Sequence, residues 1–122
     1  RYSFHWMGTS DRLYVFEAPI DLMSFISLYP QDWQTHSYAA LCGTSEHSML
    51  WMLEQNPQLQ KISLCLDNDD AGQKAVERLT GILWEYGYID IASLLPEAKD
   101  WNNELLVQHN EDAAPAISIK MG

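Results

Sequence analysis

The stretch KISLCLDNDDAG, residues 61–72, decides how this chain folds. Its first six residues are mostly apolar, as is typical of a parallel strand covered on both faces, and they run directly into four acidic or amide side chains. Two unit charges about 4 Å apart repel by about 4 kcal/mol at an effective dielectric near 20, so such a cluster needs a reason. A bound divalent cation is one reason. The four side chains are Asp67, Asn68, Asp69 and Asp70.

Strand-like and helix-like segments alternate on both sides of this stretch. Pro19 suits the first position of a helix that stops at Pro30, and Gly87 suits a helix C-cap. Alternation predicts an α/β fold, a parallel sheet of about four strands flanked by helices, with ligands beyond the carboxyl ends of the strands. The expected strands are 2–6, 13–17, 37–42, 61–66 and 88–96, the first two paired as an N-terminal hairpin, and the expected helices are 19–30, 46–56, 71–87 and 99–109.

Size and charge restrict the class of protein. The chain has 122 residues, 47% of them hydrophobic, which is enough for one compact core, so we interpret residues 1–122 as a single domain. Because residue 1 starts abruptly in strand-like sequence without a Met, we expect this domain to be part of a longer multidomain protein. The net charge is −10, and the 7 basic residues are scattered. A duplex-binding surface needs clustered Lys and Arg, so none is expected on the isolated domain.

The cysteines and the apolar runs predict where the protein works. Cys42 and Cys65 have no metal-type spacing, which favours a reduced, intracellular protein. No stretch approaches the ~20 apolar residues of a membrane span, and the first residues lack the apolar run of a signal peptide. We therefore expect a soluble, cytoplasmic protein without membrane partners.

Acidic residues follow the predicted strands at their carboxyl ends. Glu17 ends one strand, Asp67 and Asp69 follow another, and Asp100 follows the last. In extended backbone Asp67 and Asp69 point the same way and Asn68 the opposite way. Two carboxylates on one side suit Mg²⁺, which takes oxygen ligands and keeps several waters.

A structural role for the acids remains open at this point. Asp70 stands where the next helix begins, and we expect it to cap that helix rather than to bind metal. Acidic residues at strand-to-helix junctions are often only caps or solvated turns, and Glu17 taken alone is better explained as a solvated edge charge. Gly72 lets the backbone approach a neighbour closely in the first helical turn.

Four stretches carry a resemblance to a known family. They are VFEAPID (15–21), LCGTSEH (41–47), CLDNDDAGQKAVERL (65–79) and LLPEAKDWNNELL (94–106). In this order they resemble the motifs of a Toprim domain, the catalytic module of bacterial primases, type IA and type II topoisomerases and certain nucleases. The resemblance covers a core of residues 13–107 and is nearest to the primase-like branch in plasmid, phage and conjugative-element proteins. It implies a Toprim (Rossmann-like) fold.

The resemblance also implies roles for five acids. Glu17 matches the lone glutamate, a general acid or base or a metal ligand. Asp67 and Asp69 match the pair that binds Mg²⁺, for which Mn²⁺ can substitute. Asp21 matches an acid one helical turn after the glutamate, and Asp100 an acid near the end of the domain. Phosphoryl transfer needs metal ions that neutralise phosphate oxygens and align the reacting groups, which agrees with these assignments.

Two departures from the family pattern are visible. Ala18 and Pro19 stand where bacterial primases have Gly after the glutamate, and Asn102 stands where a further Asp is expected. The second departure leaves open whether one or two metal ions are bound.

Three further residues are candidates for substrate contacts. The backbone N–H groups of Gly43 and Thr44 lie between a strand end and a helix and suit a phosphate, although a tight turn explains them equally well. Lys99 is a cation close to the acids and suits either a substrate phosphate or a neighbouring carboxylate. For Trp101 we favour packing over stacking on a base.

The function expected from these features is Mg²⁺-dependent nucleotidyl transfer by a primase-like module in the replication or transfer of a mobile element. DNA or RNA is then recognised through neighbouring domains of the parent protein, nucleotides are possible ligands, and the isolated domain is inactive. A Toprim nuclease and a non-catalytic module that binds metal or nucleic acid are the alternatives. A phosphotransfer receiver domain is disfavoured, because the order of its Asp and Lys is not present.

Overall fold

A computed structural model of the chain describes residues 4–41 and 45–110, and in it five strands form one sheet in the order β1-β3-β2-β4-β5. Strands β3, β2, β4 and β5 pair with one another in parallel, and β1 pairs with β3 in antiparallel orientation. This confirms the predicted parallel α/β sheet. The strands are β1 (His5–Trp6), β2 (Arg12–Phe16), β3 (Ser37–Ala40), β4 (Lys61–Leu64) and β5 (Asp90–Ser93).

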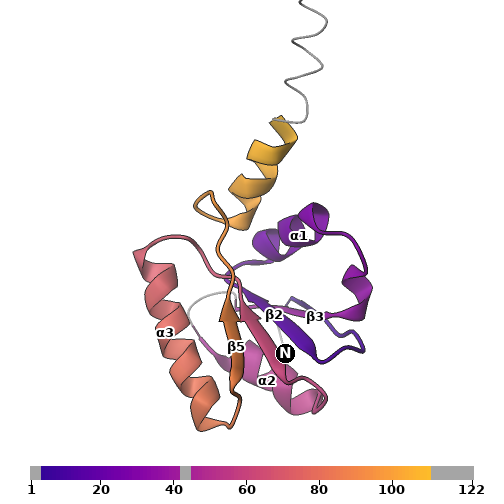
Figure 1. The fold of residues 1–122 in the computed structure, drawn as a ribbon, viewed down its shortest axis with the longest axis vertical. Helices are drawn as coiled ribbons and strands as arrows, with labels where there is room; N and C mark the ends of the chain where they lie inside the picture. Colours follow the sequence, from indigo (N-terminus) through magenta and orange to yellow (C-terminus); the bar gives the residue numbers. More distant parts are fainter. Residues whose placement is uncertain (1–3, 42–44, 111–122) are drawn as a thin grey trace, which may run out of the picture.

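Helices cover both faces of the sheet (Figure 1). Helix α1 and a last helix, residues 101–110, lie on one face, and α2 and α3 lie on the other. The expected start of α1 at Pro19 is confirmed, and Gly87 follows the end of α3 with φ of +92°, a value that favours glycine. The bounds are α1 (Pro19–Leu28), the 3₁₀ helix η1 (Trp33–Thr35), α2 (His47–Gln55) and α3 (Asp70–Glu85).

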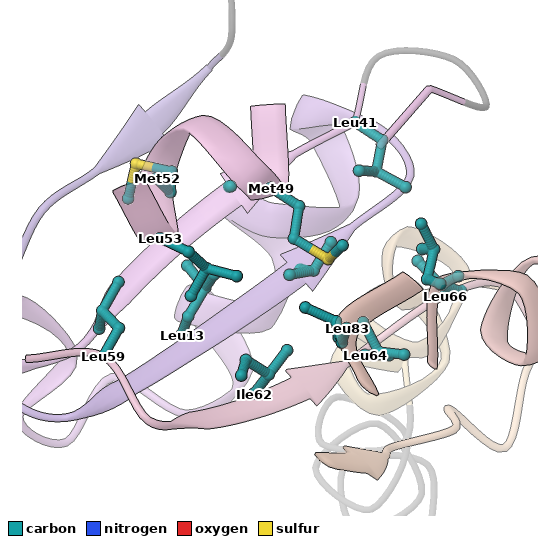
Figure 2. Close-up of a cluster of buried hydrophobic side chains, with 13 residues drawn as sticks. Leu13, Leu41, Met49, Met52, Leu53, Leu59, Ile62, Leu64, Leu66 and Leu83 are labelled. Atoms are coloured by element: carbon teal, nitrogen blue, oxygen red, sulfur yellow. The ribbon is translucent and has the colours of Figure 1, made fainter. Parts of the chain in front are cut away.

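The larger core lies between the sheet and helices α2 and α3 (Figure 2). Leu13 and Val15 of β2 and Ile62 and Leu64 of β4 alternate toward this face and are at most 1% exposed. Apolar burial of this extent is the main favourable term in folding. The helices contribute Met49, Met52, Leu53, Leu79 and Leu83.

A second core lies on the α1 face and is rich in aromatic rings. Phe16 and Tyr38 of the sheet pack with Phe25 of α1 and with Trp101, while Tyr14 is only partly buried. Helix α1 and the beginning of helix 101–110 leave part of this face uncovered, so a pocket remains beside Tyr14. The two faces of the sheet are therefore packed to different degrees.

The N-terminal strand is present, but its partner differs from the prediction. Strand β1 pairs with β3, so the predicted hairpin of residues 2–6 with 13–17 is not formed. The reason is that β3 and β4 occupy both edges of β2. In addition, Gly8 lies so close to Thr35 that a Cβ atom would be 2.2 Å from its carbonyl oxygen, and Thr9 N–H donates to the same oxygen at 2.8 Å. Gly8 and Thr9 thus hold the chain against the end of η1, directly before β3.

The predicted core strand 88–96 is a short edge strand. Only Asp90–Ser93 is extended, and its exposure is high except at Ile91, which packs against α3 and the larger core. Strand β5 has one neighbour, β4, and an outer edge in solvent. Edge strands with polar residues of this kind resist pairing with other chains.

Candidate functional site

The acidic residues of the site come together because β2 and β4 are parallel neighbours. Val15 lies opposite Leu64, so Glu17 and Asp67, which follow these strands, leave the sheet at the same edge. Asp69 follows in extended backbone at the start of α3. The sequence therefore predicted correctly which edge of the sheet collects the carboxylates.

Three carboxylates lie close enough to share one cation. Asp21 in the first turn of α1, Asp67 after β4 and Asp100 before helix 101–110 each offer one oxygen, and these oxygens lie within 4.8 Å of one another. We call these three residues the acidic triad. Asp21 is 4% exposed, so at least this carboxylate is removed from water.

Asp67 has the clearest need for a partner. Its Oδ1 is buried and accepts no hydrogen bond within the described ranges 4–41 and 45–110. A buried acceptor without a partner costs about 1–3 kcal/mol, and more when it is charged. A hard cation with oxygen ligands would satisfy this atom, so the donor set fits Mg²⁺ or Mn²⁺.

The pKa values show the cost of placing acids together. Burial, followed by the negative charge of Asp67, raises the pKa of Glu17 to about 7, although the Asp67 backbone N–H opposes this. Burial also raises the pKa of Asp21 to about 6, with the carboxylates of Asp67 and Asp100 adding to it. The pKa of Asp67 is raised by burial and by the charges of Asp100 and Asp69, while a side-chain hydrogen bond from Glu17 and the charge of Lys99 oppose this. Without a cation the site holds protons near neutral pH.

The link between α1 and helix 101–110 holds Asp21 in place. Asn102 N–H donates to Asp21 Oδ1 at 3.3 Å, and the Ser24 hydroxyl donates to Ile20 O at 2.8 Å and approaches Asn102 Oδ1 at 3.3 Å. Asn102 therefore positions Asp21, a role that its place in the family pattern did not predict.

Asp69, and not Asp70, caps α3. Asp69 Oδ1 accepts a hydrogen bond from Gly72 N–H at 2.7 Å, whereas Asp70 is the first helical residue and is exposed. The prediction for Asp70 was wrong by one residue, because Asp69 itself has extended backbone, with φ of −148° and ψ of 175°, and α3 already begins at Asp70. Asp69 Oδ2 makes no hydrogen bond or ion pair with the residues that the structure describes, so Asp69 remains a predicted metal ligand, as the family resemblance implies.

Gly72 explains how tightly this loop is closed. A Cβ atom on Gly72 would lie 2.1 Å from the backbone oxygen of Asp67, which no side chain tolerates. Gln73 Nε2 donates to the same oxygen at 3.4 Å. The close approach expected for Gly72 is confirmed.

A loop from the end of the sheet brings Asp100 to the triad. Asn68 N–H donates to Lys99 O at 2.6 Å, and the Asn68 side-chain amide donates to Pro96 O at 3.0 Å. Trp101 is 4% exposed and its indole N–H donates to Cys65 O at 3.1 Å, so the packing role expected for it is confirmed. Sequence reasoning missed Asn68 as a positioning residue; an amide inside a run of acids is the signal that points to it.

Asp100 also caps its own helix. Asp100 Oδ1 accepts from the Asn103 N–H at 2.8 Å and from the Asn103 side-chain amide at 2.9 Å. Asp100 therefore both begins this helix and belongs to the acidic triad. Lys99 is exposed and lies near enough to lower the pKa of Asp67. Gly43 and Thr44 lie outside the described residues.

Comparison with known proteins identifies the family. A family model described as Toprim-like matches residues 14–105, most of the chain. The chain belongs to the Toprim-like family. The Toprim resemblance read from the sequence is therefore confirmed, and the acidic edge described above lies inside the matched range.

Two curated relatives of this Toprim-like chain come from mycoplasmas. The uncharacterized protein MG010 homolog of Mycoplasma pneumoniae is 36% identical over 78 residues, 63% of this chain and 36% of that protein. Uncharacterized protein MG010 of Mycoplasma genitalium is 31% identical over 77 residues, 61% of this chain and 34% of that protein. The chain thus spans about a third of the length of these relatives.

Two solved structures share the Toprim-like fold and are primase proteins. The primase fragment of the bacteriophage T7 primase-helicase protein matches with a TM-score of 0.67 and 26% identity, over 92% of this chain and 45% of that one. The second structure is a complex of the T7 lagging-strand DNA polymerase with two primase domains, bound to an RNA/DNA hybrid and dTTP. It matches with a TM-score of 0.67 and 26% identity, over 90% of this chain and 54% of that one. The chain is thus a primase-like Toprim domain.

No helix within residues 4–41 and 45–110 is long and apolar enough to cross a membrane.

Proposed function

We propose that this Toprim-like chain is the Mg²⁺-dependent nucleotidyl-transfer module of a primase-like protein that acts in the replication or transfer of a mobile element. The observation that carries the proposal is the acidic triad around the unpartnered Asp67 Oδ1, with Glu17 beside it at the same edge of the sheet. Proteins of this fold with primase activity are among its structural matches.

The metal ligands in this proposal are the acidic triad, with Asp69 as a further ligand through its free oxygen and Glu17 at the rim. When bound, Mg²⁺ or Mn²⁺ supplies positive charge that neutralises phosphate oxygens and aligns the groups that react. The residues fit this role because their carboxylates are partly desolvated and repel one another.

Glu17 is the residue that exchanges a proton in this proposal. Its carboxyl group lies beside Asp67 at the edge of the sheet that collects the metal ligands, a position that suits a general acid or base. Lys99, close to Asp67, provides a positive charge for a substrate phosphate. Gly43 and Thr44 remain proposed phosphate contacts through their backbone N–H groups.

Template binding is assigned to other parts of a longer protein. The net charge of −10 opposes binding of a polyanion, and the Debye length of about 8 Å at physiological salt does not remove repulsion at close range. The chain covers about half of the phage primase chains that it matches, which leaves room for such parts in those proteins. DNA or RNA and nucleotides are therefore the proposed ligands of the parent protein.

The experiment that tests this function measures primer synthesis and strand cleavage by the parent protein with Mg²⁺. Glu17→Gln keeps the size of the side chain and removes its charge, so we expect turnover to fall at least about 100-fold while template binding is kept. Glu54→Gln, an exposed change on α2, is the matched control and should leave turnover unchanged. Cleavage without synthesis would identify a nuclease.

The alternative function is an interaction module without turnover, which the strongly negative charge favours. Normal turnover in Glu17→Gln, or no turnover in the unchanged parent protein with either metal, would make this alternative the better one.

A further inference from the structure

A second site is formed on the α1 face of the sheet, and none of the acidic triad lines it. A pocket of about 460 Å³ opens there, which lies within the size range of small-molecule sites. We call it the aromatic pocket, and it is lined chiefly by Tyr14, Phe25, Tyr29, His36, Tyr38 and Trp101.

Polar groups without partners face this pocket. Tyr38 is 2% exposed and lines the pocket, yet its hydroxyl group makes no hydrogen bond within the described part of the chain. Tyr14 stacks on Tyr38 with ring centroids 5.4 Å apart, and its hydroxyl is likewise unpartnered among those residues. Both hydroxyls are open to the pocket, so a ligand that offers hydrogen-bonding atoms is favoured over a purely apolar one, which would cover these groups without giving them a partner.

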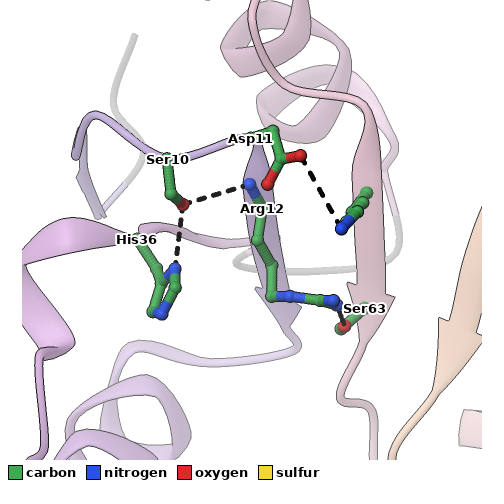
Figure 3. A network of polar contacts seen from close by, with 6 residues as sticks. Ser10, Asp11, Arg12, His36 and Ser63 are labelled. Atoms are coloured by element: carbon green, nitrogen blue, oxygen red, sulfur yellow. Dashed lines mark hydrogen bonds and ion pairs between the residues drawn. The ribbon is translucent and has the colours of Figure 1, made fainter.

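A positive charge lies at the side of the aromatic pocket. The guanidinium of Arg12 is 5.8 Å from the ring centroid of Tyr14 and donates to the Ser63 hydroxyl at 2.8 Å (Figure 3). Within residues 4–41 and 45–110 it forms no ion pair; the neighbouring acid Asp11 contacts Lys61 instead, at 3.8 Å. In a chain of net charge −10, a guanidinium without a carboxylate partner indicates an anionic ligand.

Together, the aromatic rings, the polar groups and Arg12 favour one chemical class of ligand. Aromatic faces favour a flat ring, the tyrosine hydroxyls and the second nitrogen of His36 favour hydrogen-bonding atoms on its edge, and Arg12 favours a phosphate and repels a cationic ligand. A nucleobase attached to a phosphate has all three properties, and stacking of a base on an aromatic side chain is worth about 1–3 kcal/mol.

We propose that the aromatic pocket and Arg12 bind one nucleotide, with its base among the rings and its phosphate on the guanidinium. This site is separate from the acidic triad and does not depend on metal. A base with an attached phosphate can come from a free nucleotide or from one unit of a single strand. Trp101 directly follows Asp100, so a strand held in the pocket lies beside the acidic edge.

The test is calorimetric titration of the 122-residue chain with AMP in EDTA, which removes any metal bound at the triad. We expect saturable binding with a Kd below about 1 mM. Arg12→Gln should weaken it about tenfold, because a charge-assisted hydrogen bond is lost, and Tyr38→Phe about fivefold. Lys74→Gln removes the same charge from the exposed surface of α3 and should change nothing. Adenosine should bind the unchanged chain as weakly as AMP binds the Arg12 variant.

A short oligodeoxyadenylate distinguishes the sources. Tighter binding than AMP supports the site and identifies a single strand, and equal or weaker binding supports it as a site for free nucleotides. The proposal is overturned by the absence of saturable binding of both probes up to about 5 mM. It is also overturned by binding that neither variant weakens, or by a structure of the parent protein in which its own side chains fill the pocket. Thermal melting of each variant shows that it is folded, and Tyr38→Phe removes only one hydroxyl group.

Discussion

The two strand-to-helix junctions that supply the acids are built differently. At the β4–α3 junction Asp69 caps the helix, with its Oδ1 accepting from Gly72 N–H at 2.7 Å. At the β2–α1 junction the N-cap is Ala18, which makes no side-chain cap, and Asp21 accepts instead from Asn102 N–H of another helix. One junction uses its acid for its own helix, and the other directs its acid across the site.

This difference separates acids that also cap a helix from acids that make no helix cap. Asp69 and Asp100 each satisfy one oxygen at a helix N-terminus, where negative charge is favourable. Glu17, Asp21 and Asp67 have raised pKa values because burial and neighbouring acids disfavour their charged forms. The second group is therefore expected to respond most strongly to metal and to pH.

The largest expected effect is on the β4–α3 junction itself. Gly72→Ala places a methyl group 2.1 Å from the backbone oxygen of Asp67, and backbone cannot move as a flexible side chain does. We expect a loss of about 3 kcal/mol or more in the free energy of unfolding, measured by urea denaturation in EDTA. The matched control is Gly81→Ala in the middle of α3, where nothing lies within 4 Å of the new methyl group. This change should stabilise by about 0.5–1 kcal/mol. Equal effects of the two substitutions would show that the junction is not as tightly closed as described.

The next effect is on the stabilisation by Mg²⁺, which should differ between Asp67 and Asp69. With Mg²⁺ at ten times its Kd, the unchanged chain should gain about 1.4 kcal/mol of stability. Asp67→Asn should remove this gain, because Asp67 belongs to the triad and has an unpartnered buried oxygen. Asp69→Asn should keep much of it and keep the cap, since Asn caps helices as well as Asp. Thermal melting with and without Mg²⁺ measures both. A larger loss in Asp69→Asn than in Asp67→Asn would reverse the assignment of the principal ligand.

Local signals in the sequence predicted the elements well. Pro19 limits the backbone at the start of α1, and the glycine at 87 takes a positive φ, so both boundaries follow from the residues themselves. The collection of acids at one edge also follows from local information, because parallel strands end at the same edge. The family match over residues 14–105 agrees with this reading.

Contacts between distant residues were not predictable in the same way. The partner of β1 depends on a close approach of Gly8 to Thr35, and no pattern in residues 2–17 contains that information. The capping residue of α3 depends on where β4 leaves the sheet, to within one residue. Asn68 and Asn102 act through hydrogen bonds to segments 28 and 81 residues away.

The smallest expected effect is a change of stability with pH, because Glu17 is only partly buried and solvent screens most of the energy of its pKa shift. The pKa of Glu17 is raised in the folded chain from its ordinary value of 4.5 to about 7, so between these values the folded state holds a proton that the unfolded state releases. The contribution of protonated Glu17 to the free energy of unfolding is fully present below about pH 4.5 and is lost as the pH rises through 7. Glu17→Gln cannot ionise, so its melting temperature in EDTA, relative to the unchanged chain, should rise across this interval and level off above it. Glu54→Gln on α2 should show no such rise. A difference between Glu17→Gln and the unchanged chain that stays constant from pH 4.5 to 8 would mean that Asp67 and burial do not hold the Glu17 proton, and the separation of the two groups of acids would fail at this residue.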